Sequence, residues 1–252
     1  MSAVRAELRK AAGSAPIRWA LLLGMLLPPL LAWFNGSGIR AEMDAGIIER
    51  DLEVIGSGEL LLAGAAAAVI GVVLIGAEYV AMPNELGGGR QATTTALATP
   101  SRLRALGAKL AVAVGLLGLL GGVSAFGSLL VAQRALGSHA LPLDAERSGQ
   151  GTAGMGYVVL YGLLAFAVTA LVRRGLVPLI YLVANQTVIS VGYLLTLRWR
   201  WAWYLPDTSA MAIMRTPADP GQPPAAIGLT VGIAWVVGLL VLAAVLNERR
   251  EA

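Results

Sequence analysis

The sequence predicts an all-α membrane protein with six membrane-spanning helices, and two observations lead to this prediction. First, 57% of the 252 residues are hydrophobic and 13% are charged, with a mean hydropathy of +0.72, whereas a soluble domain carries about 25% charged residues. Second, the apolar residues are gathered in runs of about 18–25 residues, enough to cross a hydrocarbon core of about 30 Å. Strand-like alternation is absent, which disfavours a transmembrane barrel. We therefore expect one transmembrane domain over residues 1–252.

The elements follow from where each apolar run begins and ends. Residues 1–16 place Val4 and Leu8 on one side of a helical turn and Arg5 and Arg9 elsewhere. This pattern predicts a short helix in the membrane interface, and a solvated basic leader is the alternative. The predicted spans are residues 17–34, broken at Pro28 and Pro29, then 59–82, 106–131, 154–172, 176–197 and 225–246.

The distribution of basic residues predicts the orientation of the chain. An even number of spans places both chain ends on one side of the membrane. The segments on that side hold 12 of the 19 basic residues, and those on the other side hold seven, mixed with most of the acids. The positive-inside rule therefore predicts that both termini are cytoplasmic. The preference for Arg over Lys, with many Ala and Gly residues, is typical of a GC-rich bacterial genome, so we expect a bacterial inner membrane.

Composition and spacing argue against several kinds of active site. The chain has no cysteine, and its single histidine, His139, cannot form an imidazole-rich metal site. An intramembrane serine protease would need Ser124 and His139 on facing helices at one depth, but His139 follows Gly137 in an outer loop. Residues 87–90 (GGGR) lack the spacing and the Lys-Ser/Thr pair of a nucleotide P-loop. We expect no catalytic residue, metal site or cofactor in this chain, and no nucleic-acid partner.

Two spans are rich in small residues. The second span contains Gly64, Gly71 and Gly76, and the third places Gly118 and Gly122 four residues apart. Small side chains let helix backbones approach closely in lipid, where no hydrophobic effect draws helices together. We interpret these faces as packing surfaces within the chain and not as a dimer seam.

The longest polar interruption is the cytoplasmic stretch 78–109. A glycine triplet lets its backbone turn, and residues 93–97 and 101–108 are helix-like. Their leucines form an apolar edge, and Arg102 and Arg104 offer charge-assisted hydrogen-bond donors. A short helix with such a face at the membrane surface is typical of a docking element for another protein.

Glu78 stands at the cytoplasmic end of the second span. An ionisable residue at such a position is a functional hypothesis. It is also explained as an interfacial anchor that reaches water, or as the partner of Arg90 or Lys109.

The fifth span is the most polar. Asn185, Gln186, Thr187 and Ser190 are candidates to line a translocation path. Hydrogen bonding between helices explains these side chains equally well.

The outer segment 198–224 begins with aromatic residues, including Trp199, Trp201 and Trp203, which predict a belt at the membrane interface. A short apolar helix is then expected over residues 206–214, before a series of prolines ends it. Because this helix is too short to span, it is either a re-entrant element or an interfacial helix lying on the bilayer.

These features together resemble the permease subunit of ABC-2-type transporters. Those permeases have six spans, an N-terminal interfacial helix, and a second span that ends in an acid. A Gly-rich turn then leads to a helix of the form t-l-x-x-P-x-R-x-x-x-x-x-K. The matching residues are Glu78, Gly89, Thr94, Leu97, Pro100, Arg102 and Lys109. This chain departs from the pattern at Arg90, where the family often has Gly-Thr, and at Glu85, an additional acid.

The resemblance implies that a separate ATPase subunit holds ATP and Mg²⁺ and pushes on a cytoplasmic coupling loop, residues 83–105. It also implies a second permease copy, in a homodimer or with a related permease, and export of an amphipathic small molecule such as an antibiotic or drug. The residues it implies for ATPase coupling are Glu78, Gly89, Arg90, Thr93, Thr94, Leu97, Pro100, Arg102, Arg104 and Lys109. Those it implies for an outer gate are Pro206, Asp207, Met211 and Met214.

The main alternative function is an ion- or proton-coupled secondary transporter that needs no ATPase. That class usually shows internal repeats and ionisable groups near the membrane midplane. The sequence shows no clear repeat, and its acids lie at the ends of spans. A membrane enzyme is a third hypothesis, but the sequence offers it no paired catalytic groups. A scaffold or immunity protein that uses the same fold is a fourth.

Overall fold

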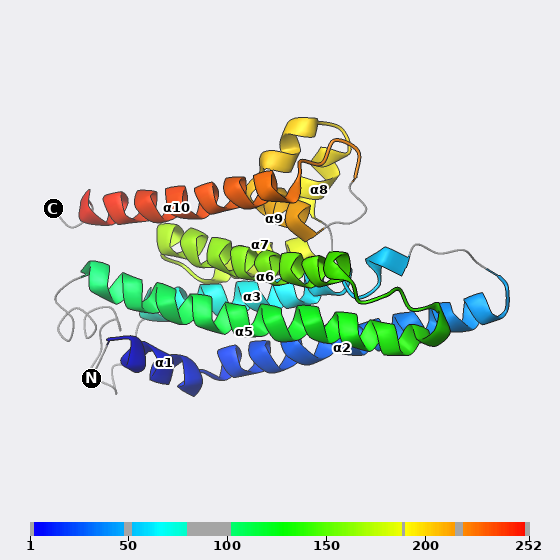
Figure 1. The fold of residues 1–252 in the computed structure, drawn as a ribbon. Coiled ribbons are helices and arrows are strands. Elements are labelled where there is room, and N and C mark those ends of the chain that lie inside the picture. The colour runs from blue at the N-terminus through cyan, green and yellow to red at the C-terminus, as the bar shows by residue number, and fades with distance from the viewer. Residues whose placement is uncertain (1–2, 48–51, 80–101, 188–189, 215–218, 250–252) are drawn as a thin grey trace.

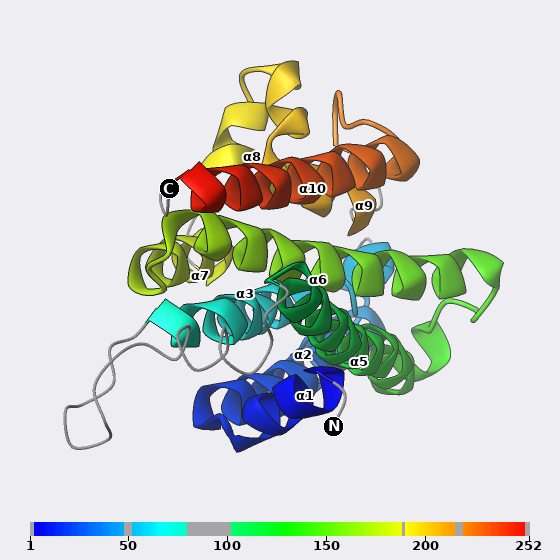
Figure 2. The ribbon, with the colours of Figure 1, turned by 90° about the vertical axis from the view of Figure 1, so that its left-hand side faces the viewer.

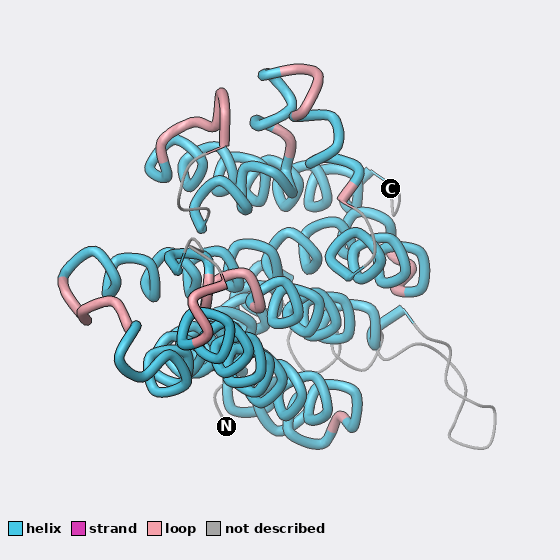
Figure 3. Tube along the Cα trace, turned by 90° about the vertical axis from the view of Figure 1, so that its right-hand side faces the viewer, coloured by secondary structure: helices cyan, strands magenta, loops and turns pink. Residues whose placement is uncertain are grey.

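The structure, a computed structural model, describes residues 3–47, 52–79, 102–187, 190–214 and 219–249. The described residues form a bundle of helices and contain no strand (Figures 1 and 3). The helices are α1 (Ala3–Gly13), α2 (Ala15–Asp44), α3 (Leu60–Gly76), α5 (Arg102–Leu136), α6 (Ala145–Val172), α7 (Leu176–Thr187), α8 (Val191–Thr196), α9 (Pro206–Met214) and α10 (Ala225–Arg249). Short 3-10 turns add η1 (Leu52–Val54), η2 (Ala77–Tyr79), η4 (Gly137–His139) and η5 (Arg200–Tyr204).

Five of the described helices are long and apolar enough to cross a membrane. They are Ala15–Asp44, Leu60–Tyr79, Arg104–His139, Ala145–Val172 and Ala225–Leu246. These segments contain the first, third, fourth and sixth predicted spans and overlap the second, whose residues 80–82 lie outside the described residues. The prediction of an all-α chain with membrane-length helices is therefore confirmed at this level.

The fifth predicted span, 176–197, is not one continuous helix. α7 has 12 residues and α8 has six, and neither reaches the roughly 20 residues that cross a bilayer. Two side chains satisfy backbone groups at the break: Asn185 Oδ1 accepts the Val191 N–H at 3.2 Å, and Ser190 Oγ accepts the Tyr193 N–H at 3.0 Å. Non-helical backbone is tolerated in apolar surroundings only when its polar groups are satisfied in this way.

The predicted break at Pro28 and Pro29 is wrong, because α2 continues through both prolines. Each proline removes one backbone hydrogen bond. α2 packs along much of α5, and Pro29 lies against Gly127 of that helix. Such lateral packing keeps a helix continuous where an isolated one would bend.

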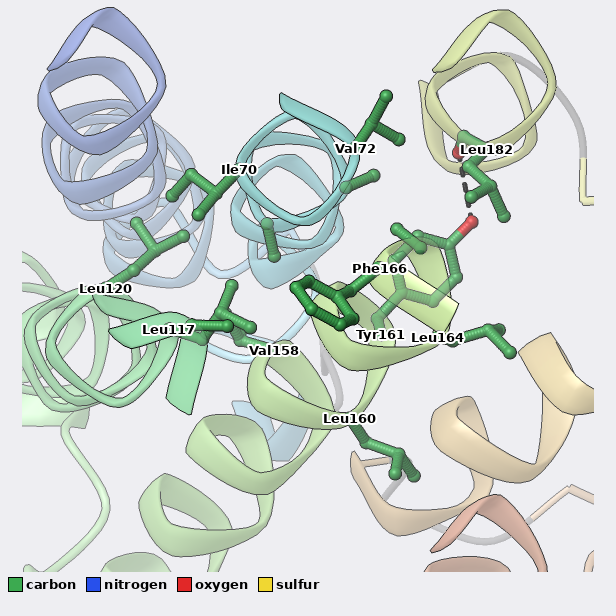
Figure 4. Packing of buried hydrophobic residues seen from close by; sticks show 14 of the residues in the cluster. Ile70, Val72, Leu117, Leu120, Val158, Leu160, Tyr161, Leu164, Phe166 and Leu182 are labelled. Carbon is green, nitrogen blue, oxygen red and sulfur yellow. Dashed lines mark hydrogen bonds between the residues drawn. The ribbon is translucent and has the colours of Figure 1, made fainter. Parts of the chain in front are cut away.

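The core is centred on α3, where 12 of 17 residues are buried. This helix lies between α2 and α5 on one side and α6 and α7 on the other (Figure 2). Its side chain Ile70 points toward α2 and lies near Leu120 of α5, and Val72 points the other way, toward α7 (Figure 4). Because α3 is apolar on all sides, it can be covered by neighbours in every direction.

Small residues set the distance between the central helices. A Cβ added at Gly71 of α3 would collide with the Gly162 carbonyl oxygen of α6 and lie 2.9 Å from the Phe166 nitrogen. Gly118 and Gly122 of α5 face Met155 of α6. A Cβ added at these glycines would lie 3.8 and 3.9 Å from the Met155 side chain. These faces pack within the chain, as predicted from the sequence.

The ends of the helices are sorted between the two ends of the bundle. Figure 1 places α1, the end of α10, the end of α3 and the beginning of α5 together at one end. The opposite end holds α8, α9 and the connection between α5 and α6. The two polar clusters described next lie at these two ends.

Candidate functional site

Two groups of enclosed polar side chains in the described part of the bundle contain residues that the sequence analysis singled out. The first, called the Lys109 cluster, consists of Glu7, Lys10, Glu78 and Lys109. The second, called the Asp207 cluster, consists of Tyr157, Asn185, Gln186, Ser190 and Asp207.

The Lys109 cluster joins three elements through one buried ammonium group. Lys109 is 3% exposed, and its Nζ lies 2.6 Å from Glu7 Oε2 on α1 and 3.0 Å from Glu78 Oε1 on η2. Glu7 is also buried, and its other oxygen lies 2.9 Å from the Nζ of the half-exposed Lys10. Two carboxylates face two ammonium groups, so the charges of the cluster cancel.

A pocket of about 240 Å³ opens beside this cluster, between α1, the start of α2, the end of α3 and α5. The four charged side chains line it together with apolar ones such as Ile17 and Val73. The amphipathic pattern of α1 explains the arrangement, because Glu7 and Ala11 lie one turn apart on its buried face. α1 is therefore held against the bundle by an ionic contact as well as by its apolar side chains.

The pKa of Glu7 has a consequence for stability. Burial of the carboxyl raises this pKa, but hydrogen bonds and charges from Lys109 and Lys10 outweigh burial, so the pKa lies below its ordinary value. The unfolded chain thus binds a proton more readily than the folded chain. We expect the stabilisation of the fold by Glu7 to be complete above the ordinary glutamate pKa of about 4.3. This stabilisation is lost as the pH falls through the lower pKa of Glu7 in the folded chain.

This expectation is checked by measuring the thermal unfolding midpoint of detergent-purified protein during acidification. Wild type should lose more stability below about pH 4.3 than the Glu7→Gln variant, which has no carboxyl to titrate. Glu146→Gln removes an exposed acid on α6 and should follow wild type. Equal losses in wild type and Glu7→Gln would contradict the assigned pairing.

The structure brings together two of the residues predicted for ATPase coupling, Glu78 and Lys109. The interpretation of Glu78 as the partner of Lys109 is confirmed. Arg102 begins α5 as predicted for the piece that runs into the third span, and Arg104, two residues later, is exposed. The others, Gly89, Arg90, Thr93, Thr94, Leu97 and Pro100, lie outside the described residues.

The sequence analysis missed Glu7 and Lys10 as members of this cluster. One signal was present, because Glu7 is the only acid in residues 1–16, a segment that is otherwise basic. A single acid on the apolar side of a basic amphipathic helix indicates a buried cation on a neighbouring element.

The Asp207 cluster joins the broken helix α7–α8 to α9. Asp207 is 8% exposed, and its Oδ2 accepts hydrogen bonds from Asn185 Nδ2 at 3.2 Å and from Ser190 Oγ at 3.4 Å. A Cβ added at Gly192 would lie 2.6 Å from Asp207 Oδ1, so only glycine leaves room for the carboxylate there. Among the described residues, no cation pairs with Asp207.

The side chains predicted for a translocation path mostly form hydrogen bonds between helices. Asn185 and Ser190 bind Asp207, and Gln186 Oε1 accepts a bond from Tyr157 of α6 at 2.5 Å. Thr187 does not join them, because it is exposed and donates to the Val183 carbonyl of its own helix. The interpretation as interhelical hydrogen bonding is confirmed for Asn185 and Gln186.

The residues predicted for an outer gate lie on α9. Pro206 begins this helix, and Asp207, Met211 and Met214 are all buried. α9 packs against α6 and α10, so it is enclosed by protein and does not lie on the surface of the bundle. In the preceding turn, Trp199 and Trp201 are exposed as expected of a belt, but Trp203 is 1% exposed and belongs to the interior.

The remaining candidates from the sequence are not brought together. Ser124 is fully buried and donates to the Leu120 carbonyl of its own helix at 2.7 Å. His139 Nε2 lies 2.7 Å from Asp44 Oδ1 at the end of α2. The structure therefore does not assemble a serine–histidine pair.

No family model matches the sequence, and no curated protein matches it.

Proposed function

We propose that this chain is the permease subunit of an ABC-2-type transporter in a bacterial cytoplasmic membrane. It exports an amphipathic small molecule, such as an antibiotic or drug, and a separate ATPase subunit binds ATP and Mg²⁺. Both termini and the coupling loop face the cytoplasm. Two permeases, identical or related, form the working unit.

The observation that carries this proposal is the Lys109 cluster. α3 with η2 ends at Tyr79, just before the coupling loop, and α5 begins at Arg102, within the last residues of that loop. Lys109 of α5 pairs with Glu78 of η2 and with Glu7 of α1. A force applied to the coupling loop would therefore act on three elements that are already tied together.

α5 supports the proposal because it can transmit such a force. It runs without interruption for 35 residues from Arg102, and it packs against α1, α2, α3 and α6. Closely packed helices move as rigid bodies and deform little. Displacing the first turn of α5, where Arg102 and Arg104 lie, would shift its contacts along the whole bundle.

The decisive experiment is gentle purification from native membranes, identification of the co-purifying chains, and an ATPase assay. The proposal expects a stoichiometric partner with a nucleotide-binding domain and hydrolysis that vanadate inhibits. A chain that purifies alone and without ATPase activity would overturn the proposal in favour of an ion-coupled transporter.

Reversing two charges tests the coupling loop itself. Arg102→Glu with Arg104→Glu should lower transport by about 5–150-fold, the range of a coupling free energy of about 1–3 kcal/mol, while the protein stays folded in the membrane. Transport is measured as substrate efflux from vesicles, alongside ATP hydrolysis. The matched control, Arg198→Glu with Arg200→Glu, changes two exposed arginines at the other end of the bundle and should leave coupling intact. Unchanged transport in the first variant would remove the docking role of these arginines.

A further inference from the structure

Asp207 is a buried carboxylate that no ion pair explains. Only 8% of the residue is exposed, and the described residues supply no cation to it. An ionised carboxylate in apolar surroundings is costly, and such groups pair with a cation or take up a proton. The residue is not fully enclosed, since 8% of its surface stays exposed.

The described groups on the neighbouring elements do not supply the cation that an ionised Asp207 would need. The titratable side chains facing Asp207 are the phenols of Tyr157 and Tyr161 on α6 and of Tyr181 on α7. Phenols are neutral at physiological pH. α8 and η5 add Tyr193, Tyr204 and Arg200, and the Arg200 side chain lies over Gly221. The described side chains of α10 include no titratable group.

The hydroxyl of Ser190 can serve Asp207 in both charge states. Ser190 Oγ lies 3.4 Å from Asp207 Oδ2 and 3.9 Å from Met211 Sδ, and a hydroxyl rotates freely between acceptors. When Asp207 is ionised, the Ser190 O–H donates to Oδ2. When Oδ2 carries a proton, that O–H donates to Ser190 Oγ, and the Ser190 hydroxyl turns to the Met211 sulfur. Both states thus keep their hydrogen bonds.

From this geometry we infer that Asp207 is an exchangeable proton site, at which a proton from water binds Oδ2 and the Ser190 hydroxyl reorients toward Met211. The site lies where α7, α8 and α9 meet. Proton uptake removes the negative charge from the contact that joins the broken helix to α9. The inference does not depend on whether an ATPase drives transport, so it can fail or hold independently of the proposed function.

Infrared difference spectroscopy of the purified protein tests the inference. Spectra are compared between about pH 3 and about pH 9, a range that contains the ordinary carboxyl pKa values. Subtracting the Asp207→Asn spectra from those of wild type should leave the C=O stretching band of one protonated carboxylic acid, which appears on acidification and shifts in D₂O. The matched Asp219→Asn variant removes a less buried acid of the same outer segment and should keep that band.

Two further variants make the result independent of how well Asp207→Asn folds. Asp207→Glu keeps a carboxyl and should retain the band at a changed frequency. Ser190→Ala removes the hydroxyl partner and should shift the frequency of the Asp207 band. Identical acid-band titrations in wild type and Asp207→Asn would overturn the proton site, and so would a band unaffected by both Asp207→Glu and Ser190→Ala.

Discussion

Lys109→Met is expected to lower the free energy of unfolding by about 3–5 kcal/mol, the usual effect of removing one partner from a buried ion pair. The substitution leaves Glu7 and Glu78 close to each other without the ammonium that now lies 2.6 and 3.0 Å from them. The buried carboxylate of Glu7 and the partly exposed one of Glu78 repel each other and lose their compensating charge. The effect is measured from chemical or thermal unfolding of the purified protein.

The same cluster provides the control. Lys10→Met also removes an ammonium group from Glu7, but the side chain of Lys10 is 41% exposed, so we expect a loss of at most about 1 kcal/mol. Adding Glu7→Gln and Glu78→Gln to Lys109→Met should recover much of the lost stability, since neutral replacement of a whole buried ionic group is often tolerated. Equal effects of the two lysine substitutions would contradict the central position of Lys109.

Gly71→Ala is expected to destabilise the protein by about 1–3 kcal/mol or more, the cost of overpacking a core. The new methyl group would collide with the Gly162 carbonyl oxygen and lie 2.9 Å from the Phe166 nitrogen. Both obstacles are backbone atoms of α6, so no side chain can rotate away. α3 and α6 would have to separate, which loosens the centre of the bundle. Unfolding measurements on the purified variant check this.

An identical substitution at an open position isolates the cause. Nothing lies within 4 Å of a Cβ added at Gly115 of α5. Gly115→Ala should therefore gain stability by up to about 1 kcal/mol through helix propensity alone. A Gly71→Ala variant as stable as Gly115→Ala would show that α3 and α6 do not meet backbone to backbone at this point.

Sequence patterns alone determined the features that depend on residues close together along the chain. Runs of apolar residues predict membrane-length helices, because crossing a hydrocarbon core demands both length and apolarity. The run over residues 225–246 coincides with the span found in α10. The polar residues of the fifth span and the short helix at 206–214 were also visible, since each interrupts an apolar pattern locally.

The tertiary structure decided which of these features meet. Glu7 and Lys109 are 102 residues apart, and no local pattern predicts that one neutralises the other. The sequence suggested Asn185 for a translocation path and Asp207 for an outer gate, as two separate hypotheses. The packing of α9 beside the broken helix brings the two side chains together. The course of α2 through Pro28 and Pro29 and the break between α7 and α8 have the same cause. A helix continues or stops according to whether neighbouring helices and side chains satisfy its backbone, and the identity of those neighbours is set only when the bundle assembles.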